Sequence, residues 1–153
     1  MINDQEFLQG AAFSRLFSYG CQIMISHMVS IHTSMYLIET NSSKSAVLFK
    51  ISKKPKSAWS FTLSSKEQIA LNALSSKFPC ISLFIAFICH RDGICCISQE
   101  HLWNVLDRES SIVDHHISIS RQLNGSYRVA GSSGQRMNQT VPQSNWPRVV
   151  LLK

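Results

Sequence analysis

Acidic residues are scarce in this chain, and two long stretches lack them entirely. The 153 residues contain nine Asp and Glu against fifteen Lys and Arg, which gives a formal net charge of +6 at pH 7. Residues 40–65 contain no acid, and residues 16–38 contain no Asp, Glu, Lys or Arg. The excess of positive charge favours an anionic partner such as nucleic acid, although many proteins that bind no nucleic acid are also modestly basic.

Several sequence motifs are missing, and each absence argues against a class of function. The chain has neither a Walker motif nor a G-x-G-x-x-G loop, so no nucleotide cofactor is expected. It has no G-x-S-x-G nucleophile elbow to organise its scattered Ser, His and Asp residues into a hydrolase site. Residues 1–7 carry two acids and no base, which is a poor signal-peptide start. The run 16–38 has too few consecutive apolar residues for a membrane span.

The cysteine content argues against a disulfide framework and against a zinc site. The number is odd, the spacing is irregular, and four of the five lie in or beside apolar runs, where a free thiol behaves as a small hydrophobe. This usage indicates a reduced compartment, so a cytoplasmic location is expected. No C-x2-C spacing is present, and adjacent cysteines on a strand point to opposite faces. The cysteines are Cys21, Cys80, Cys89, Cys95 and Cys96.

The remaining composition and the hydrophobic patterning predict one globular α/β domain. Hydrophobic residues make up 44% of the chain and charged residues 16%. Ser64 and Glu67 form a capping-box signature, and Asp92-Gly93 is a favoured hairpin turn. The expected helices are 4–19, 66–76 and 98–106, and the expected strands are 21–26, 35–40, 46–52, 59–63, 81–89 and 94–98. We expect a mixed central β-sheet flanked by helices.

The C-terminal third has a different character and predicts a β-hairpin followed by an extended arm. Residues 123–125, Leu-Asn-Gly, separate two alternating segments, 116–121 and 126–130. Beyond residue 131 the chain is rich in Ser, Gly, Gln, Asn and Pro. We expect residues 1–110 to form the core and residues 111–153 to pack on it as part of one domain. The residues expected to attach the arm to the core are Trp146, Val149 and Leu151.

One segment carries a family resemblance. Residues 34–52, SMYLIETNSSKSAVLFKIS, predict two strands joined by a polar turn, with Lys50 inside the second strand. They follow EFLQGAAFSRLFSYGCQIMIS and precede SLFIAFICHRDGICCIS and HLWNVL. This order resembles the PD-(D/E)XK nuclease superfamily, the restriction-endonuclease-like and Holliday-junction-resolvase-like group. The resemblance covers roughly residues 5–106 and implies a restriction-endonuclease-like core.

The resemblance also implies a metal site whose ligands are missing here. The family's helix glutamate matches Glu6 and its lysine matches Lys50, but its two strand acids fall at Met35 and Leu48. Mg²⁺ or Mn²⁺ requires oxygen ligands to activate water, so an inactive nuclease-like module is expected. Glu39 shares a strand face with Met35 but lies roughly 13 Å along the strand. A divergent metal-dependent nuclease that uses Glu6, Glu39 and Lys50 is the alternative.

The basic residues supply candidate nucleic-acid contacts. Their alternative interpretation is a solvated charged loop, with Lys50 extending its ammonium group from a strand end. The candidate residues are Lys44, Lys50, Lys53, Lys54, Lys56, Arg121, Arg128 and Arg136.

The partners expected from these observations remain broad. The resemblance implies a nucleic-acid-binding module or a subunit of a nucleoprotein complex, in prokaryotic defence or on mobile elements, with DNA favoured over RNA and no membrane partner. A protein–protein interaction module, such as an inhibitor or assembly subunit, is the competing hypothesis. In that case the apolar C-terminal end and the polar arm would dock on a partner, and further copies of the same chain also remain open as partners.

Overall fold

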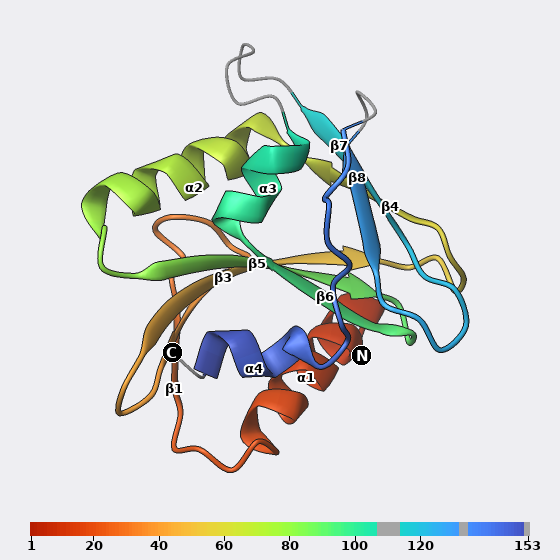
Figure 1. The fold of residues 1–153 in the computed structure, drawn as a ribbon. Helices are drawn as coiled ribbons and strands as arrows, with labels where there is room; N and C mark the ends of the chain where they lie inside the picture. The colour runs from red at the N-terminus through yellow and green to blue at the C-terminus, as the bar shows by residue number, and fades with distance from the viewer. Residues whose placement is uncertain (107–113, 132–134, 152–153) are drawn as a thin grey trace.

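The computed structural model describes residues 1–106, 114–131 and 135–151, which fold into two sheets and four helices (Figure 1). The helices are α1 (Asp4–Phe17), α2 (Ser65–Lys77), α3 (Gln99–Val105) and α4 (Asn145–Leu151). The strands are β1 (Met24–His27), β2 (Met35–Glu39), β3 (Lys44–Ser52), β4 (Trp59–Leu63), β5 (Ser82–Cys89), β6 (Gly93–Ser98), β7 (His115–Ser120) and β8 (Arg128–Gly131). The expected α/β class is confirmed. The expected boundary between residues 110 and 111 lies outside the described residues.

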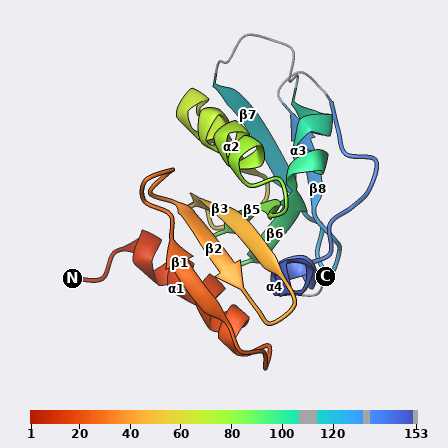
Figure 2. The same cartoon turned by 90° about the vertical axis from the view of Figure 1, so that its left-hand side faces the viewer.

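The larger sheet is mixed, as the sequence predicted. Its order is β1-β2-β3-β5-β6, and every pairing is antiparallel except that of β3 with β5. Two parallel neighbours need a long crossover, and here α2 supplies it. Helices α2 and α3 cover one face of this sheet, and α1 and α4 cover the other (Figures 1 and 2). The strands β3 and β5 are therefore buried on both sides, which explains their nearly continuous apolar sequences.

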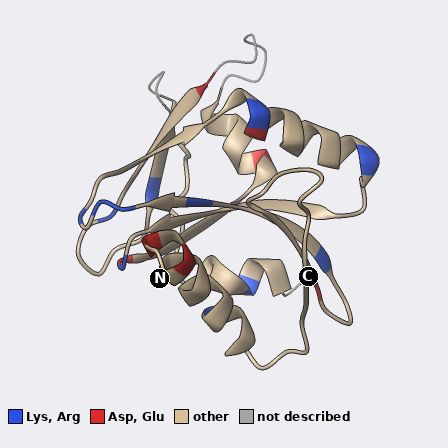
Figure 3. Cartoon of the chain, turned by 180° about the vertical axis from the view of Figure 1, so that it is seen from behind, with Lys and Arg blue, Asp and Glu red and all other residues tan. Residues whose placement is uncertain are grey.

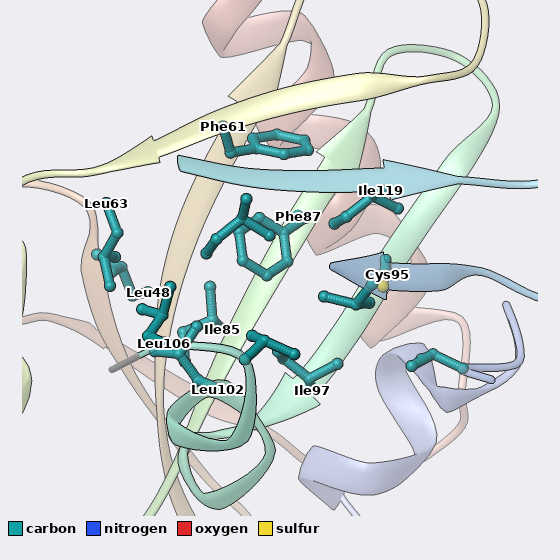
Figure 4. Packing of buried hydrophobic residues seen from close by; sticks show 14 of the residues in the cluster. Leu48, Phe61, Leu63, Ile85, Phe87, Cys95, Ile97, Leu102, Leu106 and Ile119 are labelled. Carbon is teal, nitrogen blue, oxygen red and sulfur yellow. The ribbon is translucent and has the colours of Figure 1, made fainter. Parts of the chain in front are cut away.

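Strand β4 does not pair with the larger sheet but forms a second, three-stranded sheet with β7 and β8. The β4 sequence alternates, so Trp59, Phe61 and Leu63 face inward while the residues between them face solvent. Inside, Phe61 packs on Phe87 of β5 with a ring-centroid distance of 4.8 Å (Figure 4). The two sheets thus share one hydrophobic core, which α2 and α3 complete.

The last described segment differs from the extended arm that the sequence predicted. Residues 145–151 form α4, a short helix kinked at Trp146. The Trp146 indole nitrogen donates to the Ala12 carbonyl oxygen at 3.2 Å, and the Ser45 hydroxyl donates to the Val150 carbonyl oxygen at 3.2 Å. Trp146, Val150 and Leu151 are buried against α1 and the sheet. The segment is thus held against the body of the protein by tertiary contacts that its local composition does not encode.

The sequence signals for caps and turns predicted the start of α2 and the turn before β6, but the end of α1 differs from the prediction. The capping box of Ser64 and Glu67 is present, and Gly93, with φ of 155°, begins β6 after the predicted turn. Helix α1 ends at Phe17, two residues before the expected end at residue 19. None of the helices in the described ranges is long and apolar enough to cross a membrane.

Candidate functional site

Lys50, the lysine of the nuclease-like pattern, lies in an ion pair with Glu67. Its ammonium nitrogen donates to both carboxylate oxygens of Glu67 at 2.8 Å. The Lys50 side chain is 19% exposed and that of Glu67 is 7% exposed. One Glu67 oxygen also accepts the backbone N–H of Ser64 at 2.9 Å, as part of the cap of α2. The carboxylate is therefore already occupied by three hydrogen bonds, and Lys50 ties β3 to the start of α2.

The two positions that would hold metal-binding acids lie in the hydrophobic core. Met35 and Leu48 are opposite each other in the β2–β3 ladder, and both are fully buried. They belong to the cluster that α2, α3 and the second sheet cover, where Leu48 packs among apolar side chains (Figure 4). A thioether and an alkyl group offer no hard oxygen ligand. The residues present therefore do not fit Mg²⁺ or Mn²⁺.

The two remaining candidates, Glu6 and Glu39, have other surroundings. Glu6 is exposed in the first turn of α1, where its charge complements the positive helix end. Glu39, at the end of β2, lies opposite Lys44, with a nitrogen–oxygen distance of 3.8 Å between their charged groups. The structure thus does not bring Glu6, Glu39 and Lys50 together as a metal-binding set.

The cysteines and the other possible metal ligands form no centre in the described residues. Burial raises the pKa of the Cys89, Cys95 and Cys96 thiols, so they stay protonated at neutral pH. Cys95 packs in the core beneath the second sheet, and Cys96 packs on the opposite face beside α4. In the ranges the structure describes, no group of three or more His, Cys, Asp or Glu is placed to hold a metal ion.

The basic loop between β3 and β4 is exposed, and two side-chain hydrogen bonds to its backbone carbonyl groups hold it in place. Lys53, Lys54 and Lys56 are all exposed, and the loop carries the blue segments at the side of Figure 3. The Lys54 ammonium donates to the Ala58 carbonyl oxygen at 2.7 Å, and the Trp59 indole donates to the Lys54 carbonyl oxygen at 2.8 Å. These bonds fix the path of the loop, so its lysines project from a defined surface.

Arg121 is placed differently from the other basic candidates. Its guanidinium forms a bidentate pair with Asp92, at 2.6 and 2.8 Å, and the Tyr127 hydroxyl donates to the same carboxylate at 2.8 Å. The hydrogen bond from Arg121 lowers the pKa of Asp92. Burial and the bond to Asp92 raise the pKa of Tyr127. Arg121 therefore joins the β5–β6 turn to the second sheet.

Arg128 and Arg136 border a polar cavity that the sequence did not reveal. The cavity, of about 310 Å³, lies on the outer face of the second sheet. The alternation of residues 116–120 was the only signal for it, because it predicts serines on one side of a strand. Its position beside residues 136–140 depends on tertiary pairing. The polar residues that line it include Ser118, Ser120, Arg128, Arg136, Asn138 and Thr140.

Comparisons of the chain with protein-family models, with curated proteins and with solved structures each found no match.

Proposed function

We propose that this protein is a non-catalytic, nuclease-like module that binds nucleic acid. The observation that carries the proposal is the fate of the expected active site: Lys50 is retained but paired with Glu67, and Met35 and Leu48 fill the acid positions with buried apolar groups. The expected setting remains a cytoplasmic one, in prokaryotic defence or on a mobile element, with DNA preferred to RNA.

The order of elements supports the nuclease-like part of the proposal. Helix α1 is followed by the antiparallel strands β1, β2 and β3, and α2 then crosses to β5, which lies parallel to β3. The segments that carry the sequence resemblance, residues 6–26, 34–52 and 82–98, cover most of α1 and β1, then β2 with β3, and β5 with β6, in this order. Because one fold can support many different activities, the function has to be argued from the chemistry of the exposed residues.

The charge distribution supports the nucleic-acid part of the proposal. In the described residues, Lys50 pairs with Glu67, Lys44 with Glu39 and Arg121 with Asp92. Five of the described cations that stay exposed without such a pairing, at positions 53, 54, 56, 128 and 136, lie on or near the second sheet, and the other five are spread over other elements. Exposed, unpaired cations are the groups that neutralise backbone phosphates.

The test combines binding and cleavage in one assay. The protein is mixed with labelled duplex and single-stranded DNA and RNA, with and without Mn²⁺, at two salt concentrations. We expect salt-sensitive binding and no cleavage. The triple variant Lys53→Glu, Lys54→Glu and Lys56→Glu should bind at least tenfold more weakly, by an order-of-magnitude estimate for several lost phosphate contacts.

A matched charge reversal on other elements is the control. Arg15→Glu, Lys66→Glu and Lys77→Glu change the net charge equally, and all three side chains are exposed on helices away from the basic loop. Equal loss of binding in both triple variants would show a diffuse charge effect and not a nucleic-acid site. Metal-dependent cleavage by the wild type, abolished by Lys50→Ala, would instead establish the divergent nuclease.

Exposed apolar side chains favour a protein–protein module as the second candidate. Phe17 and Met24 are about 60% exposed, and Met24 lies on β1, the edge strand of the larger sheet. An edge strand with exposed apolar residues can pair with another chain. The C-terminal end does not offer such a surface, because Trp146 and Leu151 are buried. Association that persists at high salt and is lost in Phe17→Glu/Met24→Glu, measured by sedimentation, would favour this candidate.

A further inference from the structure

The outer face of the second sheet is polar and, within the described residues, free of acids. The inward residues of β4, β7 and β8 are apolar, so the residues between them must face away from the core. The ladder places Ser60 opposite Ser118, and Ser120 opposite Arg128. Hydroxyl groups and a guanidinium therefore share one face of three neighbouring strands.

Residues 135–141 run alongside β8 and border this face. Arg136 pairs with Ala130 of β8 through an antiparallel bridge, and the Met137 N–H donates to the Val129 carbonyl oxygen at 3.0 Å. The backbone of the segment is thus fixed beside β8, while the Arg136 side chain stays exposed. The cavity of about 310 Å³ lies between this segment and the strands β7 and β8.

Two cations line the cavity, and a third lies beside it. Arg128 and Arg136 line it, and Ala58, whose carbonyl oxygen accepts the Lys54 ammonium at 2.7 Å, lines it as well. Within the described ranges, no carboxylate forms an ion pair with any of the three. Their positive charge is therefore available to an external anion, in contrast to that of Arg121.

We propose that this outer face, with Arg128, Arg136 and Lys54, is where the protein contacts the phosphate backbone of duplex nucleic acid, an inference that rests on the proposed function. Guanidinium groups bind phosphate oxygens with two parallel hydrogen bonds, and hydroxyl and amide groups complete such contacts. Ser118, Ser120 and Asn138 supply these neutral donors beside the cations. Among the described residues, the outward positions of these strands carry no Trp or Tyr, two of the residue types that anchor protein interfaces.

The same surface chemistry favours a duplex over a single strand. Single-stranded nucleic acid is held by aromatic side chains on which successive bases stack. The outward positions of β4, β7 and β8 carry Ser60, Thr62, His116, Ser118, Ser120, Arg128 and Ala130, with no Phe, Tyr or Trp. Contacts from this face therefore reach phosphates and read little sequence, so affinity should fall steeply with salt.

The experiment measures fluorescence anisotropy of a labelled DNA duplex, and of one of its strands alone, across a salt series. The variant Arg128→Ala/Arg136→Ala should lower the slope of log affinity against log salt by about 1.8, which corresponds to about 30-fold weaker duplex binding at about 0.15 M salt. Lys66→Ala/Lys77→Ala on α2 is the control with the same charge change, and it should keep the wild-type slope. Both arginines are exposed, so the melting temperature should not change; if it falls, Arg128→Gln/Arg136→Gln carries the same test.

The outcomes separate this inference from the proposed function. If the wild type binds no nucleic acid, both fail. If it binds, but only the loop variant at Lys53, Lys54 and Lys56 loses affinity while the arginine pair does not, the surface is wrong and the proposed function stands. Tighter binding to the single strand, or displacement of the duplex by an equal charge of poly-glutamate, would also overturn the inference. The second of these results would point to an acidic protein partner.

Discussion

The Lys50–Glu67 pair offers the sharpest test of whether Lys50 has a structural role. Substituting Lys50 by Met keeps the length and apolar stem of the side chain and removes its charge. Glu67, only 7% exposed, then loses both 2.8 Å bonds from the ammonium and keeps only the bonds of the helix cap. A buried carboxylate without its cation is destabilising, because its charge is neither solvated nor paired.

The expected cost is about 2–3 kcal/mol in the free energy of unfolding. Breaking a fully buried pair costs about 3–5 kcal/mol, and the 19% exposure of the Lys50 side chain reduces this figure. For a chain of this size, the loss corresponds to a fall in melting temperature of about 4–12 °C. The companion variant Glu67→Gln keeps an oxygen for the cap, since glutamine also forms capping boxes, but it leaves the lysine unpaired.

A double-mutant cycle gives the decisive number. The variant Lys50→Met/Glu67→Gln contains no unpaired charge, so it should be more stable than the sum of the single changes predicts, by about 1–2 kcal/mol. Urea unfolding monitored by circular dichroism measures all four proteins. A loss below about 0.5 kcal/mol in Lys50→Met would refute the structural role, as would a coupling energy near zero, because surface substitutions give changes of that size.

Three further predictions test other parts of the structure. Met35→Asp places an acid at one position of the nuclease pattern, and because the carboxylate enters an apolar core it should lower the free energy of unfolding by at least about 3 kcal/mol. Added Mn²⁺ should not recover this stability, and thermal melts with and without the metal measure both effects. Arg121 lowers the pKa of Asp92, so the pair contributes stability above the unfolded-state pKa of about 3.9, and this contribution is lost as the pH falls below that value. Asp92→Asn should therefore make the free energy of unfolding less dependent on pH in the acid range. An unchanged pH dependence would contradict this role. A Cβ at Gly131 would collide with the Val105 carbonyl oxygen, so Gly131→Ala should cost about 1–3 kcal/mol by urea unfolding, whereas a neutral result would place β8 further from α3.

The positions of most helices and strands could be predicted because their signals are local. Alternation in residues 59–63 gave β4, and the run 81–89 gave the buried strand β5. The capping box at Ser64 gave the start of α2. In each case the residues that decide the structure lie within a few positions of one another, so hydrophobic period and capping chemistry are sufficient.

The candidate site was less accessible to such reasoning. The sequence singled out Lys50 and the missing acids, but it gave no reason to pair Lys50 with Glu67, 17 positions away. It grouped Arg121 with Arg128 and Arg136, although the first pairs with Asp92 and the others border a cavity. A count of charges does not show which of them are neutralised, because that depends on which strands become neighbours.

By itself, the sequence determined the α/β class, the order of elements up to α3, and the apolar character of positions 35 and 48. Only the tertiary structure decided that β4 pairs with β7, that residues 145–151 form a helix beside α1, and that residues 136–140 border a polar cavity beside β8. The physical reason is range. Backbone period and helix caps act over a few residues, whereas strand partners, ion pairs and cavities form between segments whose proximity is set by burying one shared core.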